Sequence, residues 1–93
     1  MEVTIYGLYD RKTGNFGDLC TLRCDAEFVD GLTRMFKDSD LPDYYLEDLV
    51  GFAYGTLTSH AGDYPEIKPF DVPRIVFYGR SILNNRTLEV NNE

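Results

Sequence analysis

Arginines alternate with aromatic residues toward the end of this 93-residue chain, and no acid lies between Val72 and Leu88. Guanidinium groups neutralise phosphates and flat rings stack on unpaired bases, so this combination is typical of single-stranded nucleic-acid binding. The candidate nucleic-acid site consists of Arg74, Phe77, Tyr78, Arg80 and Arg86. The alternative is structural: Ile75 and Phe77 cover the core, and the arginines pair with acids of the same or another chain.

A second charged cluster is acidic and lies in the middle of the chain. Between Asp25 and Asp48 there are eight acids and two bases, within a whole-chain net charge of −7. A polyanionic surface attracts basic grooves on other proteins and can imitate the charge of DNA. The candidate protein-binding acidic face consists of Asp38, Asp40, Asp43, Glu47 and Asp48. A solvated acidic surface without a partner is the alternative.

Residues that could support catalysis or hold a cofactor are sparse. The single histidine, His60, follows Ser59 in an expected turn, and no third group is placed to orient it. The glycines lack the spacing of phosphate-binding loops. One histidine with Cys20 and Cys24 leaves a zinc site without its fourth ligand unless a second chain or a carboxylate supplies it. On an extended strand these cysteines would lie ~13 Å apart, so we expect reduced thiols. We therefore expect a non-enzymatic protein without cofactor, metal or small-molecule substrate, and an enzyme using His60 remains the alternative.

The elements that position these residues follow from the apolar pattern. β-branched and aromatic residues predict strands over 3–9, 18–24 and 49–58, and an edge strand interrupted by two prolines over 64–70. The fold class we predict is α+β, an antiparallel sheet of four to five strands with one amphipathic helix on one face. The order along the chain is β-β-α-β-β. Residues 75–78 form either a last short strand or an arm over the core.

The helix is predicted from apolar residues that recur at three- and four-residue spacing between Phe28 and Phe36. Asp25 is placed to cap its N-terminus. On the third strand, Gly51, Ala53 and Gly55 share one face, which indicates that the helix or a neighbouring backbone approaches closely there.

The chain length fits one domain, which we place at residues 1–83 and follow with a polar, frayed tail over 84–93. No segment approaches the ~20 apolar residues of a membrane span, and the first residues do not resemble a signal peptide. We expect a soluble cytoplasmic protein without membrane contact. A sheet of this size leaves an edge, so a homodimer is a further expectation.

Four short motifs occur in an order that points to a family. They are residues 3–14 (VTIYGLYDRKTG), 34–36 (RMF), 42–46 (PDYYL) and 49–52 (LVGF). Their order and spacing resemble the small nonstructural protein of gokushoviruses, single-stranded-DNA microviruses that infect bacteria. The resemblance covers residues 3–57 and implies a non-enzymatic protein of the host bacterial cytoplasm. Its implied role is in viral DNA replication, binding DNA or a phage or host replication protein and favouring single-strand synthesis and packaging.

Overall fold

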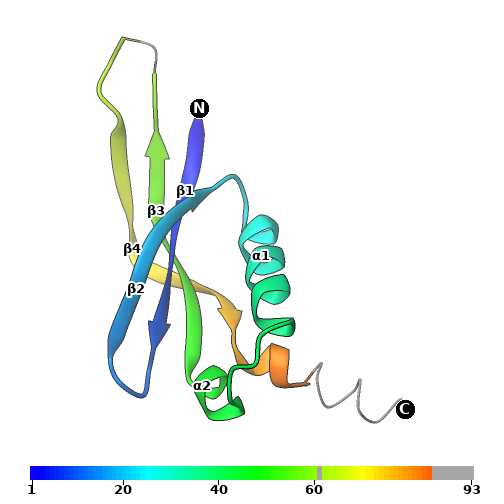
Figure 1. Ribbon diagram of the computed structural model, residues 1–93. Helices are drawn as coiled ribbons and strands as arrows, with labels where there is room; N and C mark the ends of the chain where they lie inside the picture. Colours follow the sequence, from blue (N-terminus) through cyan, green and yellow to red (C-terminus); the bar gives the residue numbers. More distant parts are fainter. Residues whose placement is uncertain (61, 85–93) are drawn as a thin grey trace.

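A computed structural model describes residues 1–60 and 62–84 and shows one four-stranded antiparallel sheet with helices (Figure 1). The strands are β1 (Glu2–Asp10), β2 (Asn15–Leu22), β3 (Leu49–Thr58) and β4 (Glu66–Tyr78). Across the sheet they lie in the order β2-β1-β3-β4, so β2 and β4 are the edges. The helices are α1 (Asp25–Lys37) and α2 (Asp43–Glu47). The predicted α+β class is therefore confirmed.

The chain differs from the prediction after Pro42 and again after Phe70. Residues 43–47 form α2, a second helix in addition to the one predicted, and β4 continues to Tyr78 instead of ending at Phe70. Residues 80–84 are helical, and the rest of the predicted frayed tail, 85–93, lies outside the described residues. The sheet thus has four strands, because residues 75–78 belong to β4.

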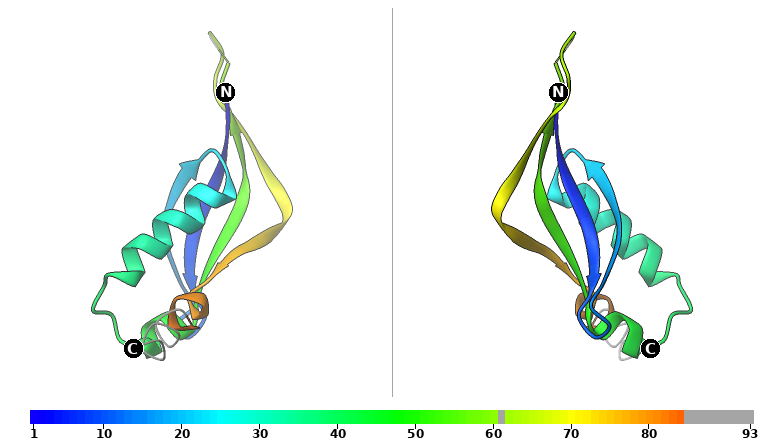
Figure 2. Two further views of the ribbon diagram at one scale, coloured as in Figure 1. Left: turned by 90° about the vertical axis from the view of Figure 1, so that its right-hand side faces the viewer. Right: turned by 90° about the vertical axis from the view of Figure 1, so that its left-hand side faces the viewer.

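Strand β4 accommodates its prolines by leaving the regular ladder. Gly55 is paired with Pro69, and Ala53 is paired with Arg74, so residues 70–73 lie opposite Tyr54 alone. The strand bows away from β3 over this stretch (Figure 2). Proline removes a ladder donor, and a bulge at a sheet edge tolerates this loss.

Helix α1 covers one face of the sheet (Figure 2) and buries Phe28, Leu32 and Phe36 against it. The prediction that Asp25 caps the helix was wrong. Cys24 occupies the cap position without a side-chain hydrogen bond, and Asp25 stands in the first turn. Its carboxylate is free for other partners, described below.

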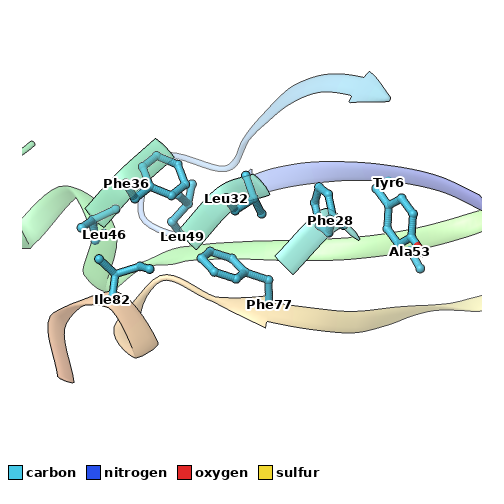
Figure 3. Close-up of a cluster of buried hydrophobic side chains, with 9 residues drawn as sticks. All are labelled: Tyr6, Phe28, Leu32, Phe36, Leu46, Leu49, Ala53, Phe77 and Ile82. Carbon is cyan, nitrogen blue, oxygen red and sulfur yellow. The ribbon is translucent and has the colours of Figure 1, made fainter. Parts of the chain in front are cut away.

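The core lies between α1 and the sheet and extends to α2 and residue 82 (Figure 3). The ring of Tyr6 stacks on that of Phe28, with centroids 4.5 Å apart, and the rings of Phe36 and Phe77 lie 6.3 Å apart. The buried cluster consists of Tyr6, Phe28, Leu32, Phe36, Leu46, Leu49, Ala53, Phe77 and Ile82.

The predicted close approach to Gly51 and Gly55 is confirmed, but the predicted shared face is not. Ala53 pairs with Tyr6 and Gly55 with Ile5, so the register shift at this point places Gly55 on the other face. A Cβ atom at Gly51 would lie 2.7 Å from Cε2 of Phe28, and one at Gly55 would lie 2.5 Å from the carbonyl oxygen of Lys68. Glycine at these positions lets α1 and β4 pack directly on the backbone of β3.

Two other glycines provide a matched test of backbone conformation, because a Cβ atom at either Gly31 or Gly14 would meet nothing within 4 Å. Gly31 is helical, so Gly31→Ala should raise the free energy of unfolding by up to ~1 kcal/mol. Gly14 has φ of 73°, so Gly14→Ala should lower it by about 1 kcal/mol. Urea denaturation of both variants measures these changes, and shifts of the same sign would contradict the assignment.

Candidate protein-binding face

The four described residues of the predicted nucleic-acid site do not share one exposed surface. Phe77 is 3% exposed and lies in the core, so its ring is not available to a base. Arg74 pairs with Asp25, and Arg80 lies 3.7 Å from Glu47. Tyr78 is half-exposed on the opposite face of the sheet, and Arg86 lies outside the described residues. The structural alternative thus holds for Phe77, which lies in the core, and for Arg74 and Arg80, which pair with acids.

Arg74 belongs to a hydrogen-bonded triad that ties three elements together. The hydroxyl of Tyr6 on β1 donates to Oδ1 of Asp25 on α1 over 2.7 Å. Both terminal guanidinium nitrogens of Arg74 on β4 donate to the same carboxylate. The hydrogen bonds from Arg74 and then Tyr6 lower the pKa of Asp25, and burial together with the bond to Asp25 raises the pKa of Tyr6 to about 12. These contacts give the triad a structural role.

The predicted acidic face lies along one segment at the end of the molecule where α1 leads into α2 (Figure 1). Asp38 follows α1, Asp40 lies in the connection and Asp43 begins α2. Glu47 ends α2 beside Arg80, and Asp48 caps it. Four of the five side chains are exposed; Asp48 is intermediate.

The remaining candidate chemistry does not converge on a site. Cys20 and Cys24 are free and exposed, and His60 is exposed in the loop that follows β3. Across residues 1–60 and 62–84 there is no group of three or more metal-binding side chains. None of the helices described is both long and apolar enough to cross a membrane.

The sheet face that α1 leaves uncovered is apolar, and it is here named the open face. Side chains of a strand alternate between the two faces, and cross-strand partners share a face. Because Tyr6 and Leu8 face the helix, Gly7 and Tyr9 face away from it. The cross-strand partners of Gly7 and Tyr9 then define two rows that span the whole sheet. The rows are Leu19–Gly7–Phe52–Ile75 and Phe16–Tyr9–Val50–Tyr78.

These rows contain no charged side chain and continue into further apolar positions. Val3 pairs with Leu57, and Leu57 pairs with Ile67, so a third apolar row lies along the same face. Phe16 and Leu19 on the edge strand β2 are 67% and 62% exposed. Scattered exposed apolar residues are ordinary, but a contiguous apolar face of this kind is a candidate interaction surface.

Aromatic rings pack against one another across the open face. The ring centroid of Tyr9 lies 4.6 Å from that of Phe16 and 6.1 Å from that of Phe52, and Phe52 lies 6.0 Å from Tyr54. These four rings and Pro73 line a hollow of about 170 Å³. The open face therefore combines a central hollow with exposed side chains at its edges.

Gly7 shapes the middle of this surface. A Cβ atom there would lie 2.8 Å from Cδ2 of Leu19 and 2.9 Å from Cε2 of Tyr54. Glycine thus lets both side chains lie down over β1. The Tyr54 hydroxyl is buried without a hydrogen-bond partner among the described residues, and burial raises its pKa. The face offers apolar contact and ring surface, with no charged group in its rows to bind an ion or phosphate.

The sequence carried part of the signal for the open face, since Val50, Phe52 and Tyr54 alternate with small residues on β3. The alignment of β2 and β4 beside these residues could not be predicted from the sequence.

Comparisons of this chain with protein-family models, curated proteins and solved structures find no match.

Proposed function

We propose that this chain is a non-enzymatic accessory protein of DNA replication in a small single-stranded-DNA bacteriophage. It acts in the host cytoplasm by binding a protein, and the open face is its binding surface. The replication setting comes from the resemblance to gokushovirus nonstructural proteins. The observation that supports binding is the uncharged, partly exposed apolar surface that extends across all four strands.

Protein interfaces have an apolar, aromatic-rich centre from which charged residues are depleted. The open face has this composition, with Phe52 and Tyr9 near its middle and exposed apolar side chains on both edge strands. Burying such side chains on a partner is worth about 25 cal/mol per Å² of apolar area removed from water, before the costs of association.

Direct contact with DNA has less support than contact with a protein. Rings alone can stack on bases, at about 1–3 kcal/mol per base, but single-strand binding also uses a positive groove along the phosphates. Arg74 and Arg80 are each paired with an acid, and the chain carries net charge −7. These charges favour a role exerted through protein contact.

The proposal is tested by complementing a phage genome that lacks this gene. We expect Leu19→Glu, which places a charge on the open face, to abolish the rescue of single-stranded DNA synthesis. Met35→Glu is the matched control, because Met35 is similarly exposed, at 55%, but lies on α1. Rescue should then equal wild type.

Equal rescue by both variants would overturn the assignment of the open face. Fluorescence anisotropy with a single-stranded oligonucleotide over a salt series distinguishes binding to a protein from direct binding to DNA. We expect no binding at physiological salt; tight binding that Leu19→Glu removes would replace the protein partner with DNA.

A further inference from the structure

We propose that the partner of the open face is a second copy of this chain, and that two sheets pack face to face in a homodimer. This inference rests on the proposed function, because both assign binding to the open face. It adds the identity of the molecule that covers that face. Three observations carry it: the distribution of charge, the size of the face and its relief.

Charge is the first consideration, because two copies that each carry net charge −7 repel one another. Close association is favoured where the contact surface itself is free of like charges. The two rows that span the sheet contain no acid or base, and the row through Leu57 contains none. The acidic segment 38–48 lies instead with α1 and α2 (Figure 1). A face-to-face pair brings together the uncharged surfaces and leaves this acidic segment outside the contact.

The size of the face approaches that of one side of a stable dimer interface. Four strands spaced ~4.8 Å apart, with nine residues at ~3.4 Å each along β1, give a flat footprint of about 600 Å². The relief of the side chains adds to this area. Specific protein interfaces bury roughly 800 Å² on each partner, whereas most crystal contacts bury less than half of that. The open face therefore approaches the area that a specific homodimer requires.

The relief of the face suits a two-fold interface. In such an interface the same patch is used twice, so projecting groups of one copy must find recesses in the other. The hollow of about 170 Å³ lies among Tyr9, Phe52 and Tyr54, near the middle of the face. Leu19, beside Gly7 on the β2 side of the face, is 62% exposed, and Ile75 in the same row at the β4 edge is 44% exposed. Each copy thus provides both a recess and exposed aliphatic groups to fill it.

Packing of sheet on sheet is a common way to bury two apolar faces, with strands aligned to within about 30° and the layers about 10 Å apart. In this chain α1 already covers one face. The second copy supplies the layer that the open face lacks, and the result is a four-layer helix–sheet–sheet–helix particle.

Sedimentation equilibrium of the full chain over a broad concentration range tests this arrangement. We expect wild type to show the mass of a dimer. Leu19→Glu and Ile75→Glu, one on each edge strand, should both sediment as monomers across the same range. Both residues are substantially exposed in the single chain, so the variants should retain wild-type circular dichroism. Met35→Glu, on α1, should remain dimeric.

The outcomes divide as follows. A monomeric wild type at every concentration would overturn the homodimer, and the complementation experiment would still decide whether the open face binds another protein. Dimers of both open-face variants, or a monomer of Met35→Glu, would place the contact between copies elsewhere and overturn the inference. Dimerisation of wild type with normal rescue by Leu19→Glu would support the homodimer and reject the proposed function.

Discussion

Replacing Phe77 with alanine should lower the free energy of unfolding by about 3–5 kcal/mol, a large share of the stability of a domain of this size. The ring is 3% exposed and packs beside Phe36, while its backbone pairs with Gly51 under α1. Truncation removes buried apolar area and leaves a cavity that the surrounding sheet and helix cannot fully close. Urea denaturation followed by circular dichroism measures the change.

Arg80→Ala is the control for this prediction, since Arg80 is exposed and its contact with Glu47 at 3.7 Å is a surface ion pair. We expect a change of no more than ~0.5 kcal/mol. Phe77 and Arg80 belong to the same predicted nucleic-acid site. The comparison therefore also distinguishes a structural role of Phe77 in the core from a role in binding nucleic acid. Wild-type stability of Phe77→Ala would show that the ring is a surface group after all.

Asp25→Ala should produce the second largest loss, about 1–3 kcal/mol, because it leaves the Tyr6 hydroxyl buried without its acceptor. It also releases Arg74, which anchors β4 to the start of α1. Asp25→Asn keeps an oxygen for Tyr6 but loses the charge, so its loss should be smaller. Equal stability of wild type and Asp25→Ala would remove the triad from the forces that hold α1 on the sheet.

The same triad predicts how stability depends on pH. Folding lowers the pKa of Asp25, so its contribution is complete above the ordinary aspartate pKa of about 3.9 and is lost as pH falls through the lower folded value. Folding raises the pKa of Tyr6 from 10.0 to about 12, so that contribution is lost as pH rises across this interval. When the free energy of unfolding is measured against pH, Asp25→Asn should show a smaller loss at acid pH than wild type. Tyr6→Phe should show a smaller loss at alkaline pH.

Elements with a strong local pattern were predictable from the sequence. The stripe from Phe28 to Phe36 and the β-branched run of β1 each specify one structure within a few residues. Strand β4 was cut short at Phe70 because Pro69 and Pro73 argue against a continuous ladder. The bulge opposite Tyr54, which admits these prolines, depends on pairing with β3 and has no local signature.

The open face was hidden for a similar reason. Phe16 and Leu19 are three residues apart, and strict alternation would place them on opposite faces of β2. They share a face because the register shifts between Gly7 and Tyr9 on β1, where Leu8 alone lies opposite both Gly17 and Asp18 of β2. The candidate site thus depends on strand register, and one residue of the predicted arginine site, Phe77, lies in the core instead.

The difference between the two edges of the sheet limits how copies can associate edge to edge. Pro69 and Pro73 interrupt the donors of β4 and the strand bows outward, whereas β2 has no proline along its eight residues. An incoming strand can therefore extend the sheet at β2 far more readily than at β4. Two copies that pair through β2 each use their one readily extended edge and leave only the β4 edges free. The prolines of β4 thus disfavour open-ended edge-to-edge assembly.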